Sequence, residues 1–246
     1  MPNVPSAPDP ASGAAALEEL WRLVEPFGGW LTRDQAGRLW EAAAAVPNGG
    51  RIVEIGSHQA KSTAILAAAM SSGVGLTAID PFDPAFEAGH DQARTAFENN
   101  LRTVGLRDRV DLVMALSHDV LHGWDQPIDL LYIDGAHDPA SVRRDLGWLA
   151  HVRPGGQVLV HDSFSSVGVT VVLYGRVLPD RRLRYTGRSG SLGAFQCASP
   201  TAASRLAMLA QLPWFLRNVV VKVARRLHLM PVARLLGHAD SRYDPF

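Results

Sequence analysis

Polar residues stand directly after several short apolar runs of this 246-residue chain, and these residues are the ones whose types could do chemistry. The runs are rich in Val, Ile and Leu and are short enough to be buried strands. The residues of interest at their ends are Glu54, Gly56, Asp80, Ser117, Asp134 and Asp162. Ligands bind in parallel sheets at the carboxyl ends of the strands, so we expect these residues to surround one site.

The loop after the first run, Glu54–Ser62, does not have the composition of a nucleotide-phosphate loop. It lacks both the G-x-G-x-x-G fingerprint and the P-loop pattern. One glycine after an acidic strand end instead suits a cofactor without a pyrophosphate. Asp80, at the end of the next run, suits hydrogen bonds to ribose hydroxyls. The alternative for Asp80 is a turn or cap residue before Pro81.

The elements that must position these residues alternate along the chain. Strands are expected at 51–57, 75–81, 109–117, 128–137 and 157–163. Helices are expected at 61–70, 91–105, 141–152 and 165–178. This alternation predicts a doubly wound α/β fold with a parallel sheet. Two helical patterns precede it at 14–27 and 32–46, with Thr32 as N-cap of the second, and a hairpin with Gly190 in its turn is expected at 183–198.

The motifs VEIGSHQAKST, TAIDPFD, DLLYIDGAH and VRPGGQVLVHDS, taken together, resemble class I methyltransferases that use S-adenosylmethionine. The resemblance covers roughly residues 50–165. It implies a seven-stranded, Rossmann-like sheet with a reversed last strand, which the 183–198 hairpin would complete. Ala60 departs from the Gly common in the first loop. The cofactor-binding residues that the resemblance implies are Glu54, Gly56, Ser57, Ser62, Asp80, Ser117 and Asp134.

Within that resemblance, these residues would contact different parts of S-adenosylmethionine. Glu54, Gly56 and Ser57 would surround the methionine part, and Asp80 would bind the ribose. Ser117 would lie near the adenine. Ser62 matches a serine that touches the cofactor carboxylate in catechol-type members.

A narrower resemblance links the chain to metal-dependent O-methyltransferases of the catechol and macrolide-sugar kinds. Asp134 and Asp162, 28 residues apart, are similar to their metal-binding pair. Those families place Asn or Asp directly after the second acid, where this chain has the weaker ligand Ser163. The resemblance implies Mg²⁺ held by Asp134, Asp162 and Ser163. Alternatively, the two acids only orient loops or the cofactor amine.

His137, three residues after Asp134, matches the offset of the general base in those families. A near-neutral pKa suits it to take a hydroxyl proton, with Asp134 also in the catalytic set. The alternative is a loop histidine bonded to Asp134 or Asp138. His161 is expected to point to the opposite face from Asp162 and is a weaker candidate ligand.

Charge is divided unevenly between the two parts of the chain. Residues 1–180 carry 13 Lys and Arg against 22 Asp and Glu (−9), whereas residues 181–246 carry 11 against 2 (+9). Residues 213–229 form an amphipathic helix if helical. Such a helix either contacts anionic lipid or packs on the domain or across a dimer. No stretch reaches the roughly 18–20 uninterrupted apolar residues of a spanning helix.

We therefore expect a disordered N-terminus (1–13), a methyltransferase domain (14–199) and a basic helical tail (200–246). The predicted activity is methylation of a hydroxyl on a small-molecule or oligosaccharide acceptor, with sugar first and phenol or catechol second.

The alternative functions are a non-catalytic membrane- or glycan-binding module, a nicotinamide enzyme and a nucleic-acid methyltransferase. No nucleic-acid partner is expected. One cysteine, Cys197, and no signal peptide favour a cytoplasmic protein, peripheral at the inner membrane face if the tail binds lipid. A homodimer is expected.

Overall fold

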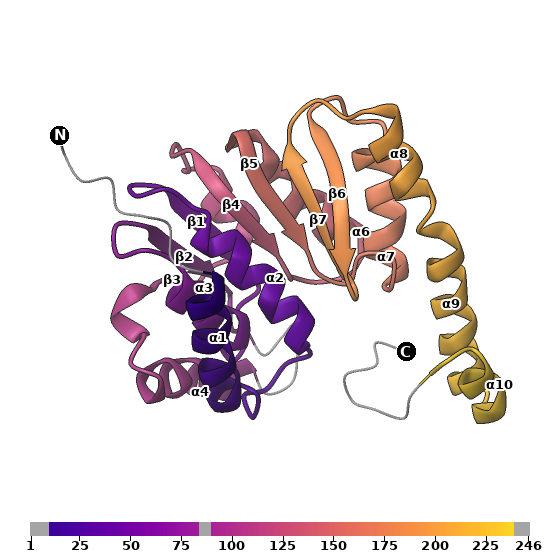
Figure 1. Ribbon diagram of the computed structural model, residues 1–246, viewed down its shortest axis with the longest axis horizontal. Coiled ribbons are helices and arrows are strands. Elements are labelled where there is room, and N and C mark those ends of the chain that lie inside the picture. Colours follow the sequence, from indigo (N-terminus) through magenta and orange to yellow (C-terminus); the bar gives the residue numbers. More distant parts are fainter. Residues whose placement is uncertain (1–9, 84–89, 239–246) are drawn as a thin grey trace.

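A seven-stranded sheet forms the centre of the protein, in the order β3-β2-β1-β4-β5-β7-β6 (Figure 1). The computed structural model describes residues 10–83 and 90–238. Strands β1 to β5 pair in parallel, whereas β7 is antiparallel to both β5 and β6. The predicted doubly wound sheet with one reversed strand is thereby confirmed. The strands are β1 (Arg51–Ile55), β2 (Gly75–Ile79), β3 (Asp111–Val113), β4 (Ile128–Ile133), β5 (Val152–Val160), β6 (Leu183–Ser189) and β7 (Leu192–Cys197).

Helices cover both faces of the sheet. Apolar residues of α1 (Pro10–Val24), α2 (Arg33–Ala44), α3 (Lys61–Ala69) and α4 (His90–Thr103) pack on one face. Residues of α6 (Pro139–Asp145) and α7 (Val167–Val172) pack on the other. The remaining helical elements are α5 (Ser117–Leu121), short turns at Arg107–Arg109 and Leu146–Ala150, a wide turn at Leu173–Val177, and α8 (Ala202–Leu209), α9 (Leu212–Arg226) and α10 (Met230–Leu235).

The central strands are buried on both faces, which explains their continuous apolar sequences. In β4, Leu130 and Tyr132 join the cluster under α1–α4, whereas Leu131 and Ile133 join the opposite cluster. Because of this alternation, successive residues at the strand ends point to opposite sides of the sheet. The side to which each residue points determines which side chains contact one another.

The predicted start of α2 is confirmed. The Thr32 hydroxyl accepts a hydrogen bond from the Gln35 amide, and the Gln35 side chain accepts one from the Thr32 amide. This reciprocal capping satisfies two amides at the first turn. The hairpin is confirmed as well, because Gly190 occupies its turn with φ +56°.

Three sequence boundaries are corrected by the structure. Helix α1 begins at Pro10, so residues 10–13 are helical rather than disordered, and residues 1–9 lie outside the described part. Strand β3 ends at Val113, so Ser117 begins α5 instead of ending a strand. The helix expected to reach residue 152 ends at Asp145, and β5 already begins at Val152 through the Pro-Gly-Gly segment.

The described part of the predicted helical tail, up to residue 238, folds as the three helices α8, α9 and α10. The predicted amphipathic segment 213–229 corresponds to α9, which spans Leu212–Arg226. These helices follow the hairpin and lie at the edge of the sheet formed by β6 (Figure 1).

Candidate functional site

A cavity of about 960 Å³ opens at the carboxyl ends of the parallel strands. This volume is at the upper end of the roughly 300–1,000 Å³ typical of ligand sites, which leaves room for a nucleoside cofactor beside a second small molecule. Most of the predicted site residues line it. Those are Gly56, Ser57, Ser62, Asp80, Ser117, Asp134, His137 and Asp162.

Gly56 allows the loops after β1 and β4 to approach each other closely. Its backbone is left-handed, with φ +84°, and a side chain there would collide with the carbonyl oxygen of Asp134. Only glycine meets both conditions without strain. Ala60, at the N-cap of α3, also has a left-handed φ of +67°, which explains why glycine suits this position in related loops.

Glu54 lies beneath this loop and does not line the cavity. It is fully buried, and its carboxylate accepts hydrogen bonds from the hydroxyls of Ser57, Ser62 and Thr63. Burial is the largest influence on its pKa; these hydroxyls oppose it and the Asp134 charge adds to it, with a net rise to about 7. The structure therefore places Glu54 as the residue that orients Ser57 and Ser62 rather than as one that faces a ligand.

Asp80 accepts hydrogen bonds from backbone amides of the same loop. One of its carboxylate oxygens accepts hydrogen bonds from the amides of Ser57 (3.0 Å) and His58 (2.9 Å), and the other accepts one from Phe82 (2.9 Å). This is the turn role that the sequence left open. Asp80 also lines the cavity, where its remaining lone pairs can accept hydrogen bonds from ribose hydroxyls.

The cavity lining also includes the apolar residues Ile79, Pro81 and Leu116. Next to Leu116, the Ser117 hydroxyl donates to Asp145, and burial raises the pKa of the Asp145 carboxyl. This arrangement suits an adenine ring. Asp145 was missed by the sequence reasoning because it ends a helix and not a strand.

Two histidine–aspartate pairs also line the cavity. His137 Nε2 lies 3.3 Å from Asp162 Oδ2, and the His137 side chain is 45% exposed. His161 Nδ1 lies 3.2 Å from Asp134 Oδ1 and is buried. The sequence alternatives paired His137 with Asp134 or Asp138, whereas the structure pairs it with Asp162.

His161 is the functional residue that sequence reasoning undervalued. It was expected to point to the opposite face from Asp162, but its Nδ1 lies 3.7 Å from Asp162 Oδ1, between that acid and Asp134. Its Nε2 lies 3.3 Å from Oε1 of the buried Gln35 of α2. Gln35 continues the network to the hairpin by donating to the Ser191 hydroxyl at 2.9 Å. Burial lowers the pKa of His161, but the charges of Asp134 and Asp162 and the hydrogen bond to Asp134 outweigh it and raise the pKa to about 9.

The oxygen donors here do not fit the predicted Mg²⁺ site. Ser163 is fully buried, donates its hydroxyl to the Val160 carbonyl at 2.8 Å and does not line the cavity, so its prediction as a ligand is corrected. Asp134 is engaged by His161 and by the Tyr132 hydroxyl, and Asp162 by His137 and the Ser165 hydroxyl. Within residues 10–83 and 90–238, no cluster of three His, Cys, Asp or Glu could hold a metal ion.

Comparison with known proteins identifies a family for part of the chain. Residues 53–163 match the family described as "Methyltransferase domain". This segment is a methyltransferase domain. Its bounds agree with the region, roughly 50–165, in which the sequence motifs lie, and they run from β1 to the end of β5. The predicted class I methyltransferase and its enzyme class are thereby confirmed.

Solved structures share the fold of the methyltransferase domain at low sequence identity. A cofactor-bound structure of Rv0187 from MTB is 19% identical with a TM-score of 0.58, covering 81% of this chain and 100% of that one. The methyltransferase PaMTH1 of Podospora anserina, bound to SAH, is 16% identical with a TM-score of 0.58 (81% and 99%). An O-methyltransferase from Bacillus cereus in complex with SAH is 20% identical with a TM-score of 0.54 (74% and 89%).

The residues present fit S-adenosylmethionine. The cavity lining includes the close-approach glycine, the serines Ser57 and Ser62, the Asp80 carboxylate, and apolar residues beside Ser117 and Asp145. The donor set thus offers partners for an amino acid, a ribose and a purine.

Proposed function

We propose that this protein is an S-adenosylmethionine-dependent O-methyltransferase that acts on a hydroxyl of a small-molecule or oligosaccharide acceptor. The pairing of His137 with Asp162 at the cavity carries the proposal. It supplies an accessible base with an orienting carboxylate, which is what methyl transfer to a hydroxyl requires.

The roles of the two residues follow from their geometry. With Nε2 of His137 directed to Asp162, Nδ1 is the nitrogen that takes the hydroxyl proton of the acceptor. Asp162 then stabilises the imidazolium that forms. When bound, S-adenosylmethionine would supply an electrophilic methyl group and would leave as the neutral thioether S-adenosylhomocysteine. His137 would hold the proton that the acceptor hydroxyl gives up. His161 is less suited to this step because it is buried between Asp134 and Gln35.

Asp134 has a positioning role in this proposal. Its carboxylate is held by the Tyr132 hydroxyl at 2.8 Å and by His161, and it lines the cavity next to the loop of Gly56. From that place it can accept a hydrogen bond from the cofactor amine, which is the non-metal alternative that the sequence left open.

Chelation with EDTA tests the magnesium assistance that the resemblance implied. Because histidines engage both carboxylates, we expect methyl transfer to continue in EDTA. Loss of activity in EDTA with recovery on adding Mg²⁺ would reinstate the metal and displace the histidine–aspartate pair from the proposal.

A sugar remains the first acceptor class and a phenol the second. Among the residues that the structure describes, Trp30 is the one Trp, Tyr or Phe lining the cavity, and its side chain is 68% exposed. A single exposed indole can pack against the apolar face of a sugar ring, whereas a phenol would gain more from an aromatic clamp.

Calorimetry with S-adenosylhomocysteine tests the proposal, with NAD as the control ligand. We expect S-adenosylhomocysteine, and not NAD, to bind one-to-one with micromolar affinity. A screen of sugar and phenol acceptors should then show methyl transfer. Absence of binding would contradict the proposed activity and favour a non-catalytic module.

A further inference from the structure

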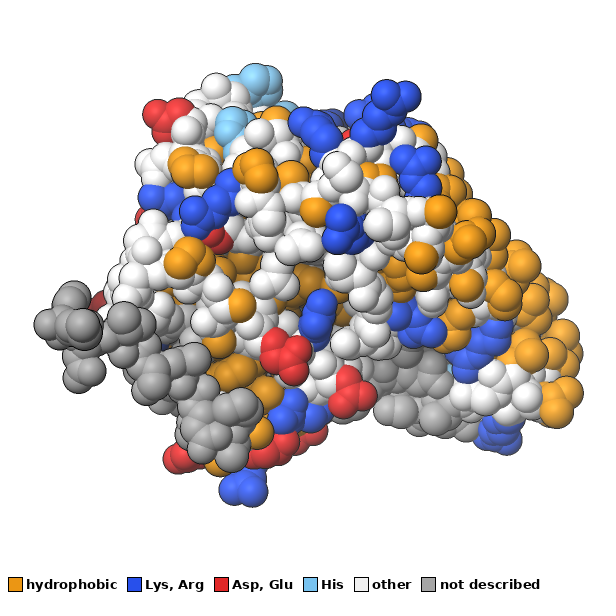
Figure 2. All heavy atoms as spheres, turned by 45° about the horizontal axis from the view of Figure 1, so that its top comes forward, with side chains coloured by type: hydrophobic (Ala, Val, Ile, Leu, Met, Phe, Trp, Pro, Cys, Tyr) orange, Lys and Arg blue, Asp and Glu red, His pale blue; other side chains and the backbone are white. Residues whose placement is uncertain are grey.

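The C-terminal helices turn an apolar face towards the outside of the protein. Five residues of α9 and its end form one stripe at helical spacing, with exposed fractions between 39% and 61%. We call this the C-terminal apolar stripe, and it consists of Leu212, Leu216, Val220, Val223 and Leu227. Leu206 of α8 and Leu235 of α10 extend it, at 65% and 86% exposed. Figure 2 shows apolar side chains gathered at this end of the molecule.

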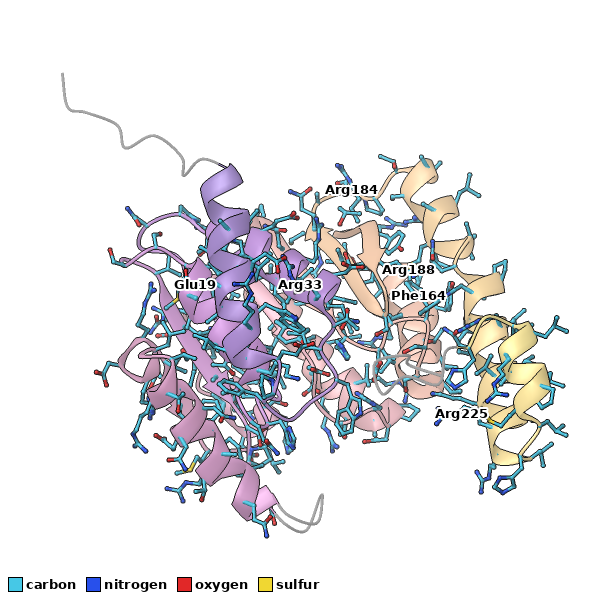
Figure 3. The ribbon with its side chains drawn as sticks, turned by 60° about the horizontal axis from the view of Figure 1, so that its bottom comes forward. Glu19, Arg33, Phe164, Arg184, Arg188 and Arg225 are labelled. Carbon is cyan, nitrogen blue, oxygen red and sulfur yellow. The ribbon has the colours of Figure 1, made fainter. Side chains whose placement is uncertain are left out.

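The other side of α9 is fastened to the methyltransferase domain. Asn218 is fully buried and donates to the Phe164 carbonyl at 3.2 Å, and Lys222 donates to the Ser165 carbonyl at 3.1 Å. Arg188 of the hairpin lies over the Trp214 ring, 4.0 Å from its centroid. Phe164 and Arg188 are labelled in Figure 3. The same side buries Val221 and Ala224 and packs Trp214 against the core, so α9 docks through this mixed polar and apolar side. Within the described residues, the stripe on its other side stays exposed.

Charge decides which occupant the stripe fits. The chain has no acidic residue between Arg181 and Ala239, and Arg205 of α8 and Arg226 of α9 are exposed on the helices that carry the stripe. A symmetric dimer through the stripe would gather the cations of both copies in one interface without an acidic residue from these helices, because a two-fold interface uses the same patch twice. An anionic bilayer instead attracts each of them, by about 1 kcal/mol per cation near the surface.

The anchors also decide how the helices would lie. The helical run Ala202–Arg226, 25 residues, is long and apolar enough to cross a membrane by length and composition, and 17% of its most apolar window is buried. Crossing would break the Asn218 and Lys222 hydrogen bonds to the domain and place several cations in hydrocarbon. Lying in the interface keeps those contacts and buries only the stripe.

We propose that the C-terminal apolar stripe docks this protein peripherally on an anionic lipid bilayer. The apolar side chains enter the boundary between headgroups and acyl chains, and the arginines of α8 and α9 contact the headgroups. The inference is independent of the proposed methyl transfer, because no residue of the stripe lines the cavity.

Vesicle flotation of the full chain tests the proposal. Vesicles of equal parts phosphatidylcholine and phosphatidylglycerol should carry the protein upward, whereas pure phosphatidylcholine should carry much less, and high salt should release it. The double variant Leu216→Glu/Val223→Glu should lower partitioning on the order of a hundredfold, from the lost burial of two apolar side chains.

The matched control is Leu23→Glu/Met114→Glu, which places the same charges on exposed apolar residues away from the tail (54% and 52% exposed). It should float like the parent protein. Both doubles should keep the melting temperature and the S-adenosylhomocysteine affinity of the parent, which separates failure of docking from failure of the cofactor site. Equal flotation of the two doubles, equal binding to neutral vesicles, or a dimer that the Leu216→Glu/Val223→Glu variant dissociates without any flotation would each overturn the proposal.

Discussion

The cavity and the C-terminal helices depart from the usual distribution of side chains in opposite ways. Around the cavity, polar and ionisable groups such as Glu54, His161 and Gln35 are buried in a hydrogen-bonded network. On α9, leucines and valines that could be buried stand exposed. Burying polar groups costs free energy unless they are paired, and exposing a contiguous apolar patch is unusual in a monomer. Each departure therefore indicates a region whose residues have a function other than stabilising the fold.

The first prediction tests the proposed base in the cavity. His137→Ala should lower kcat by roughly 10² to 10⁴-fold because the acceptor hydroxyl loses its base. Affinity for S-adenosylhomocysteine, measured by calorimetry, should be unchanged. His122→Ala changes an exposed histidine that does not line the cavity and serves as the control. Unchanged turnover of His137→Ala would remove this residue as base.

The second prediction concerns the buried carboxyl of Glu54. Its pKa is raised to about 7 in the folded protein, mainly by burial, from 4.5. Between these pH values the folded state holds one more proton than the unfolded state, so the free energy of unfolding should fall as pH rises, by roughly 3 kcal/mol in total. The stabilisation is complete below pH 4.5 and is lost as pH passes through 7.

Denaturant unfolding of the ligand-free protein at several pH values measures this effect. Glu54→Gln should flatten the dependence between pH 4.5 and 7, because the amide does not titrate in this range. An equally steep slope in the variant would show that another group is responsible.

The third prediction concerns the contact between α9 and the methyltransferase domain, where the two regions join. Asn218→Ala removes the donor to the buried Phe164 carbonyl, in the loop that carries Asp162. Leaving that carbonyl unpaired should cost roughly 1–3 kcal/mol of stability. It should also lower kcat more than it changes cofactor affinity, since Asp162 orients His137. Leu216→Ala, on the exposed side of the same helix, should leave both stability and kcat near the parent values.

The smallest expected effect compares equivalent caps in the two regions. Thr32 begins α2 and Thr201 begins α8, each with reciprocal capping. Substitution of either by Ala should cost about 1 kcal/mol in thermal unfolding. Only Thr32→Ala should also lower activity, because Gln35, its capping partner, contacts His161. Equal activity loss in both variants would argue against a role for this network.

Much of the fold follows from local sequence patterns. The alternating strands and helices, the Thr32 cap and the Gly190 turn depend on neighbours along the chain, and the structure bears them out. Boundaries failed where tertiary pairing prevailed. The Pro-Gly-Gly segment, which was expected to separate helix from strand, is the first part of β5 because Val152 pairs with Ile128 of β4.

The sequence predicted which strand-end residues form the candidate site, but it did not predict which of their side chains contact one another. Gly56, Asp80, Asp134 and His137 line one cavity because parallel strands end at one edge of the sheet. The resemblance to metal-dependent O-methyltransferases implied that Asp134, Asp162 and Ser163 surround a metal, with loop or cofactor orientation as the alternative. In the structure Ser163 turns inward to Val160, and each acid is engaged by a histidine.

The sequence by itself determined the fold class, the edge of the sheet that forms the site, and the amphipathic character of α9. Those properties come from periodicity and from residue type, which are local. Only the tertiary structure decided that His161 meets Asp134, that Gln35 of α2 completes their network, and that α9 docks through Asn218. These contacts join residues from 27 to 126 positions apart. Which of them form depends on the direction in which each side chain leaves its packed backbone, and local pattern does not encode that direction.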